Sequence, residues 1–269
     1  MSIQSSTPHL PRDPRLYIDR ILRATAEFSN WDPLKKIQVG DYGTVNRETG
    51  VFDIEGNVYE DFLDPDQKGS YQSIVEDPED SYVANSKEVT RNDIDSKSDP
   101  DVPGLAEASI KGEWEFHGDR DALLVMYRPQ KTSVPRSLLD YLEGNTIFED
   151  KSVVTSLYSC SGYFFFLGDG KNQKVKLGLR TEDVDGKAST GWWQEHDGGI
   201  HKSGFNPDGH PIFVPLFNLK IIAVIRTRYR DSPIPKLEDR WITMPRPWNI
   251  LHVDGKEWEE TVSMSPSFL

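Results

Sequence analysis

Three histidines and two aspartates lie close together in a glycine-rich stretch and offer the donor atoms of a metal site. They are His196, Asp197, His201, Asp208 and His210. Imidazole nitrogen and carboxylate oxygen are both ligands for Zn²⁺. Their spacing matches no motif with a defined ligand geometry, and a glycine-rich loop would not hold the side chains in place. Solvated loop histidines are the favoured interpretation, and the sequence predicts no metal site.

The single cysteine, Cys160, lies within the apolar stretch "SLYSCSGYFF". A nucleophilic thiol needs a neighbour that lowers its pKa, and the local sequence suggests no histidine or aspartate partner. A small buried thiol is therefore the favoured interpretation. One cysteine also excludes an internal disulfide and a thiolate zinc site.

Two further motifs were weighed as binding sites. The stretch "GDGKNQ" (168–173) lacks the length and the terminal Lys-Ser or Lys-Thr of a phosphate-binding loop, so it predicts a hairpin turn. Trp192 and Trp193 would suit the headgroup layer of a membrane, a core or a partner contact equally well. Because no catalytic constellation emerges, we expect a protein that is not an enzyme and that uses no cofactor.

Charge and composition limit the partners. The chain has 269 residues, 36% hydrophobic content and a formal net charge of −13, which argues against nucleic acid. Residues 60–101 hold thirteen acidic and four basic residues, so the rest of the chain is nearly neutral and has basic residues free for local patches. No apolar stretch approaches the roughly 18 residues of a membrane helix, and the N-terminus does not resemble a signal peptide, which favours a cytoplasmic protein.

The elements that must position these residues begin with a helix. Asp13 as N-cap and Pro14 at the first helical position predict a helix through about Phe28, after a disordered segment 1–11. Apolar residues at helical spacing would face a core: Tyr17, Ile21, Ala24 and Phe28. Arg20 and Arg23 would then lie together on the opposite side.

Strand signals follow. The stretch "IQVGDYGTVNRETGVFDIEGNVY" (37–59) predicts a hairpin with Arg47 at its tip. Further strands are predicted in 108–128, "SVVTSLYSCSGYFFFL" (152–167), "KVKLGLR" (174–180) and 211–230, and a short helix in "SVPRSLLDYLEG" (133–144). Val175, Leu177 and Leu179 alternate with charged residues, which is typical of a strand with one apolar face.

Two polar segments interrupt these strands. Residues 64–104 are acidic and proline-punctuated, and 181–210 are poor in aliphatic residues, so both are expected to be loops or conditionally folded segments. The tail, 231–269, contains five prolines and three tryptophans and is expected to pack over the surface. The predicted fold class is α+β, with a twisted antiparallel sheet and flanking helices.

The order of these elements resembles the N-terminal, pore-forming domain of gasdermins, and most closely the fungal gasdermin-like regulators of cell death. The resemblance rests on "DPRLYIDRILRATAEF", the hairpin at 37–63, "ALLVMYRPQ", "SLLDYLEGNTIFEDKSVVTSLYSCSGYFFFL" and "HPIFVPLFNLKIIAVIRTRYR". It spans residues 12–230. The remaining tail, 231–269, is too short for the repressor domain that many animal gasdermins carry.

The resemblance implies that the soluble protein binds acidic phospholipids, oligomerises and refolds two segments into hairpins of a transmembrane β-barrel. These segments would be residues 71–128 and 155–226. A closed barrel satisfies every backbone group in hydrocarbon, and each strand needs about 9–11 residues. The implied membrane-inserting residues are Leu157, Tyr163, Phe165, Leu167, Val175, Leu177 and Leu179.

The resemblance also implies lipid contacts and a trigger. In the family the first helix and the first hairpin tip contact the membrane, positions that correspond to Arg15, Arg20, Arg23 and Arg47. Activity would be restrained by the tail or licensed by a divergent gasdermin-like partner, as in fungal allorecognition, and would move the protein from cytoplasm to plasma membrane. The alternative is a non-lytic recognition module that binds another protein through the same fold.

Overall fold

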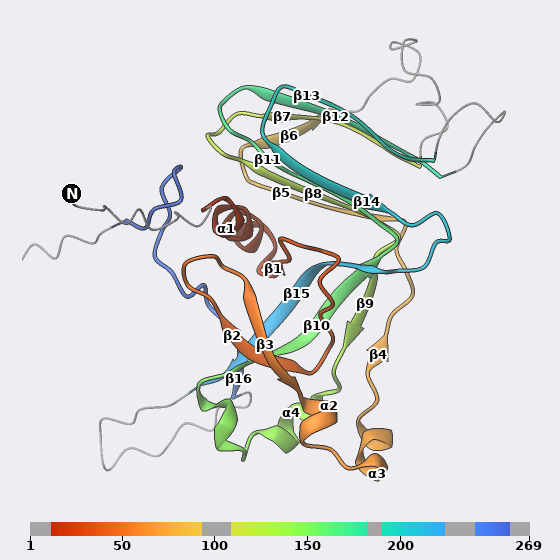
Figure 1. The fold of residues 1–269 in the computed structure, drawn as a ribbon, viewed down its shortest axis with the longest axis vertical. Coiled ribbons are helices and arrows are strands. Elements are labelled where there is room, and N and C mark those ends of the chain that lie inside the picture. The colour runs from red at the N-terminus through yellow and green to blue at the C-terminus, as the bar shows by residue number, and fades with distance from the viewer. Residues whose placement is uncertain (1–11, 93–108, 182–189, 224–239, 259–269) are drawn as a thin grey trace, which may run out of the picture.

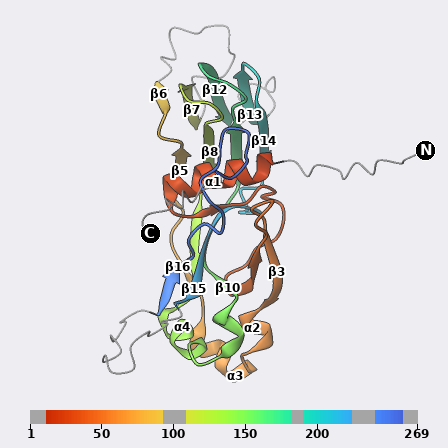
Figure 2. The same cartoon turned by 90° about the vertical axis from the view of Figure 1, so that its left-hand side faces the viewer.

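The computed structural model describes residues 12–92, 109–181, 190–223 and 240–258. These residues form an α+β fold of antiparallel sheets with few helices, as predicted (Figure 1). One sheet has eight strands, and two further sheets have four strands each. Figure 2 shows an elongated molecule with the two smaller sheets at one end, short helices at the other, and α1 (Asp13–Thr25) between them.

The eight-stranded sheet runs in the order β1-β15-β10-β2-β3, with β9 also paired to β10, β4 to β9 and β16 to β15. Its strands are β1 (Phe28–Ser29), β2 (Asp41–Val45), β3 (Phe52–Asn57), β4 (Ile74–Val75), β9 (Gln130–Ser133), β10 (Ser152–Cys160), β15 (Phe213–Ile222) and β16 (Trp241–Thr243). The predicted hairpin of residues 37–59 is the β2–β3 pair, with Arg47 in its turn.

Helices cover the two ends of this sheet. Three short helices lie at the end far from α1: α2 (Val58–Asp61), α3 (Pro65–Lys68) and α4 (Arg136–Leu142). Two 3₁₀ turns accompany them, η1 (Gly69–Tyr71) and η2 (Thr146–Glu149). The predicted short helix within 133–144 is α4, which buries Leu138, Leu139 and Leu142.

The first helix differs from its prediction in three details. Arg12, not Asp13, is the N-cap, and the helix ends at Thr25 because Ala26 adopts a left-handed conformation and donates its N–H to Leu22 O. Phe28 therefore belongs to β1. Ala24 is exposed rather than buried, since the helix turns its core face through Tyr17 and Ile21.

The two smaller sheets stack face to face (Figure 1). The proximal sheet, next to α1, has the order β14-β11-β8-β5, and the distal sheet has the order β13-β12-β7-β6. Their strands are β5 (Ser81–Asn85), β6 (Val89–Asn92), β7 (Ile110–Phe116), β8 (Ala122–Tyr127), β11 (Gly162–Leu167), β12 (Gln173–Arg180), β13 (Gly191–His196) and β14 (Ile200–Phe205).

Two expectations for the chain path were wrong. Residues 64–104 and 181–210 were expected to be loops or conditionally folded segments. The first contains α3, β4, β5 and β6, and the second contains β13 and β14. Residues 93–104 and 182–189 lie outside the described residues. These strands are short or polar, and they pair with strongly apolar strands that lie far away in sequence, so local composition underestimates them. The stretch 152–167 is two strands, because the chain leaves the eight-stranded sheet at Cys160 and enters the proximal sheet at Gly162.

Candidate functional site

The proximal and distal sheets together consist of two hairpins, each folded in half. In the first folded hairpin, β5–β8, the strands β5 and β8 pair in the proximal sheet while β6 and β7 pair in the distal sheet. The second folded hairpin consists of the four strands from β11 to β14. In it, β11 pairs with β14 in the proximal sheet, and β12 pairs with β13 in the distal sheet. Pairing of β8 with β11 and of β7 with β12 joins them into one four-stranded ribbon, bent once across its middle.

The concave face of the bent ribbon is apolar. Large side chains from both layers meet there and are fully buried: Trp114, Phe116, Leu123, Val125, Phe164, Phe166, Val175, Leu177 and Leu179. The convex face of the distal layer is charged instead. Lys174 lies between Glu113 and Glu115, and its Nζ is 3.5 Å from Glu113 Oε1 and 2.6 Å from Glu115 Oε1. The distal strands thus alternate between an apolar and a charged face, and the apolar face is sequestered only because the ribbon is folded.

The bend of the first folded hairpin lies at residues 86–88 and 117–121. Asp121 accepts the Gly118 N–H at 2.8 Å, and the Ser86 hydroxyl accepts the Ala122 N–H at 2.8 Å. Burial raises the pKa of the Asp121 carboxyl, and the nearby Glu88 carboxylate raises it further. This bend therefore contains a carboxylate that is costly to ionise.

The bend of the second folded hairpin lies at residues 168–172 and 197–199. The Gln173 side chain ties its two strands together, since its Nε2 donates to Asp169 Oδ1 at 2.5 Å and to Asp197 O at 3.3 Å. Gly199 has φ +82°, and a Cβ there would lie 2.5 Å from Phe166 Cζ. Glycine is needed at this position for both its conformation and its close approach to the ring.

His196 and His201 face each other across this second bend, with ring centroids 4.5 Å apart. Partial burial lowers the pKa of His201, and the His196 ring lowers it further. Within the described residues, no group of three or more potential ligands could hold a metal ion. His210 is exposed and lies after β14. Cys160 is buried as predicted, and burial raises the pKa of its thiol.

The seven residues with an implied membrane role do not share one face. Val175, Leu177 and Leu179 point into the concave face of the ribbon. The β11 residues of this set, Tyr163, Phe165 and Leu167, belong to the cluster on the α1 side of the proximal sheet, and Leu157 lies on β10 of the eight-stranded sheet. Alternation within β12 correctly placed Val175, Leu177 and Leu179 on one face. Across the bend at residues 168–172 the concave face passes from even-numbered residues in β11 to odd-numbered residues in β12, so Tyr163, Phe165 and Leu167 lie on the other face.

Among the four arginines with an implied lipid role, Arg15 and Arg47 both contact Glu257 of the tail. Glu257 accepts from Arg15 Nη1 at 3.1 Å and from Arg47 Nη2 at 2.9 Å. Arg15 is 7% exposed, and its Nη2 donates to Gly255 O at 2.6 Å. The hydrogen bond from Arg47 lowers the pKa of Glu257. No sequence pattern marks Glu257, because it lies in an irregular segment without periodicity.

Arg20 and Arg23 lie further along α1. Arg23 Nε contacts the fully buried Asp19 at 2.8 Å, and burial lowers the pKa of Arg23. Trp248 Nε1 donates to the same carboxylate at 2.9 Å. Arg20 donates to the backbone oxygens of Asp119 and Arg120, at 3.5 and 3.3 Å. The four arginines therefore do not form one exposed patch in this state.

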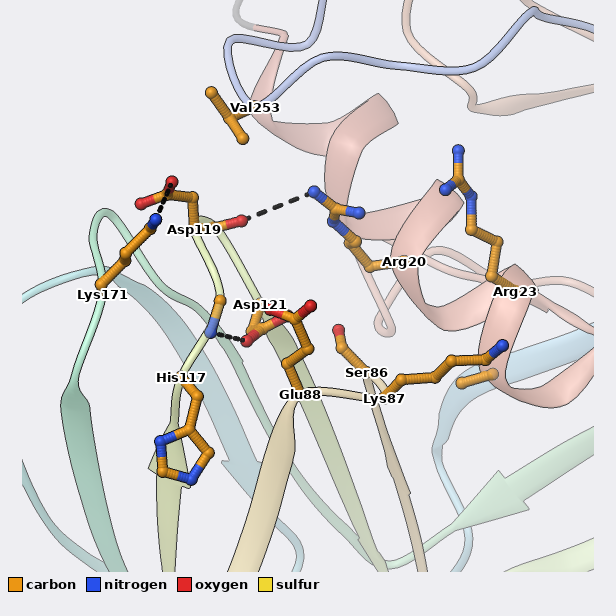
Figure 3. Close-up of a pocket in the computed structure, with 12 residues that line it drawn as sticks. Arg20, Arg23, Ser86, Lys87, Glu88, His117, Asp119, Asp121, Lys171 and Val253 are labelled. Atoms are coloured by element: carbon orange, nitrogen blue, oxygen red, sulfur yellow. Dashed lines mark hydrogen bonds and ion pairs between the residues drawn. The ribbon is translucent and has the colours of Figure 1, made fainter.

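Arg20 and Arg23 line a cleft of roughly 590 Å³ where α1, the bends and the tail meet (Figure 3). Its other lining residues with ionisable side chains are Lys87, Glu88, His117, Asp119, Asp121 and Lys171. Lys87 belongs to the first bend and Lys171 to the second, where it contacts Asp119 at 3.3 Å. No local motif signals this cleft, because its residues come from segments far apart in sequence.

No protein-family model matches this chain, and no curated protein matches it. Among the residues that the structure describes, no helix is long and apolar enough to cross a membrane.

Proposed function

We propose that this protein forms membrane pores, and that the two folded hairpins are the segments that insert. The bent ribbon carries this proposal. It holds the strands of two hairpins side by side, already hydrogen-bonded to each other, and their apolar face is buried because both hairpins are bent. The expected insertion segments, 71–128 and 155–226, include these hairpins.

Straightening the bends would give strands long enough to cross a bilayer. The four arms span residues 81–92, 110–127, 162–180 and 191–205, so the shortest has 12 residues. A crossing strand needs about 9–11 residues. Backbone groups within the ribbon would keep their partners, which hydrocarbon requires.

Straightening would also give the distal strands a lipid side and a water side. Their concave face, with Trp114, Val175 and Leu177, would face lipid. The convex face, with Lys174 and its two glutamates, would face the lumen. Strands of membrane barrels alternate in this way.

The remaining parts of the proposal follow the gasdermin resemblance. Acidic phospholipids recruit the protein from the cytoplasm to the plasma membrane, copies of the chain assemble, and the pore causes lytic cell death. Encounter with a divergent gasdermin-like partner, as in fungal allorecognition, is the proposed trigger. Among the strands that the structure describes, β5 and β14 lie at the two edges of the proximal sheet, where backbone groups could pair with neighbouring copies.

The first test is dye release from vesicles with and without acidic lipid, using the protein alone and with a divergent relative. We expect release only with acidic lipid, and more with the relative. Binding to the relative without any release would support the recognition module instead.

A second test distinguishes insertion from surface adsorption. In a Cys160→Ala background, an environment-sensitive dye is attached at Ser203→Cys, on the concave face opposite Phe164, or at Lys174→Cys, on the convex face. We expect lipid-borne quencher to act on the first dye and aqueous iodide on the second. Equal access of iodide to both dyes on acidic vesicles would contradict insertion.

A further inference from the structure

We infer that Arg15 and Arg47 form an oxyanion site that Glu257 fills from within, and that a phosphate group displaces this glutamate. The inference rests on the proposed function only for the source of the phosphate, an acidic lipid headgroup. It assigns the last described segment of the chain, 249–258, the role of an internal ligand.

The contacts around Glu257 are those of a bound anion. Oε1 accepts from Arg15 Nη1 at 3.1 Å and from Arg47 Nε at 3.4 Å, while Oε2 accepts from Arg47 Nη2 at 2.9 Å and from the Asn249 N–H at 3.1 Å. Guanidinium groups bind carboxylate and phosphate with the same planar fork. Three charged N–H donors and one backbone donor therefore surround a group that a phosphate can replace.

The site has capacity left for a larger anion. Arg15 Nε is buried and has no hydrogen-bond partner. A carboxylate offers two oxygens, whereas a phosphate monoester offers three. Arg15 Nη1 also donates to Arg47 O at 2.9 Å, which holds the hairpin turn against α1 without any help from the tail. The two guanidinium groups would thus remain close together after Glu257 leaves, and two adjacent positive charges favour a new anion.

The segment that carries Glu257 is weakly attached apart from its bonds to the two arginines. Upstream of it, Trp248 is buried and bonded to Asp19, so it anchors the tail independently. Beyond that anchor the chain forms a small turn in which Leu251 pairs with Glu257. Val253 and Trp258 are 48% and 54% exposed, whereas Leu251 is buried. Displacing Glu257 would therefore expose little apolar surface beyond the side chain of Leu251.

The test compares Glu257→Ala with Asp254→Ala. Both substitutions remove one negative charge from the same turn, but Asp254 is exposed and bonds only within the turn, to Lys256. Sedimentation with vesicles that contain phosphatidic acid, whose headgroup is a phosphate monoester, is measured against phosphatidylcholine vesicles. We expect Glu257→Ala to increase binding to the acidic vesicles about tenfold and Asp254→Ala to change it less than twofold. Glu257→Gln serves in place of the alanine variant if the latter is poorly folded.

A soluble probe separates this site from pore formation. Inositol hexakisphosphate should raise the melting temperature of Glu257→Ala more than that of the wild type, and Arg47→Gln in the same background should abolish the gain. A gain with both vesicles and the soluble probe supports a phosphate site open to either source, and a gain with vesicles alone supports a site specific for lipid. Equal behaviour of Glu257→Ala and Asp254→Ala with both probes would overturn the inference, whatever the outcome of dye release.

Discussion

The first and second folded hairpins share one topology but bend by different chemistry. The first bend is built from carboxylates, with Asp121 buried beside Glu88. The second is built from glycines and two facing imidazoles, with Gly198 and Gly199 at positive φ. The first bend thus contains acidic side chains and the second contains basic ones. The stability of the two bends should therefore change with pH in opposite directions.

The direction of each pKa shift determines whether the bend gains or loses stability as the pH falls. Burial raises the pKa of Asp121, so its contribution to stability is complete below the ordinary aspartate range and is lost as pH rises through the raised value. Burial lowers the pKa of His201, so its contribution is complete above about pH 6.5 and is lost as pH falls from there. Acid should therefore loosen the second bend while it tightens the first.

The largest expected effect concerns the core that both hairpins share. Trp114→Ala removes a fully buried side chain between the layers and should lower the free energy of unfolding by about 3–5 kcal/mol in a urea titration. Trp193→Ala, on the convex face opposite Gly178, should cost about 1 kcal/mol or less. Hydrogen exchange should rise in both hairpins for Trp114→Ala. A rise confined to β5–β8 would show that the hairpins open separately.

A smaller effect is expected from the second bend. Gly199→Ala places a Cβ 2.5 Å from Phe166 Cζ and 2.8 Å from Leu167 O in a left-handed conformation. It should cost on the order of 1–3 kcal/mol, measured by thermal and urea unfolding. Gly170→Ala, in the same bend but with no atom near the added Cβ, should change stability by less than about 0.5 kcal/mol. Similar losses for both variants would contradict the packing explanation.

The first bend should tolerate loss of its charge. Asp121→Asn keeps an acceptor for the Gly118 N–H and removes a carboxylate that burial and Glu88 disfavour. At pH 7 we expect the variant to be more stable than the wild type by about 0.2–1 kcal/mol, with the difference vanishing toward pH 4. Glu88→Gln should shift stability in the same direction. A less stable Asp121→Asn variant at pH 7 would refute this interpretation of the bend.

The smallest effect is expected from His201→Gln. Solvent screens the partly exposed imidazole pair, so the gain at pH 5.5 should not exceed about 0.5 kcal/mol. Amide exchange in β13 and β14, corrected for intrinsic rates, should accelerate between pH 7.5 and pH 5.5 in the wild type and less in the variant. His210→Gln is the matched control, since His210 lies outside the bend.

The two hairpins also differ in how far the sequence predicts them. In the second, alternation of Val175, Leu177 and Leu179 with charged residues located β12 and its buried face correctly. In the first, β5 and β6 were missed because the segment is acidic and its strands form only against β8 and β7. Strand propensity depends on the partner that covers the strand, and here the partners lie beyond residue 109.

The candidate sites were predicted less well than the strands, for a geometric reason. Resemblance selected Arg15 and Arg47, and nothing in the sequence joins them to Glu257, which is 242 residues from Arg15. The same limit applies to the cleft, where Lys87 and Lys171 meet residues of α1. Periodicity describes neighbours along one element, whereas these contacts depend on how separate elements are placed.

The distance along the chain between Arg15 and Glu257 has a consequence for synthesis. A ribosome adding about 5–20 residues per second needs roughly 12–50 s to pass from one residue to the other. During that interval the hairpin turn and α1 can fold while the carboxylate that neutralises their arginines does not yet exist. A nascent chain is therefore more cationic at this point than the finished protein, and its earliest encounters with acidic surfaces take place before its own tail can compete.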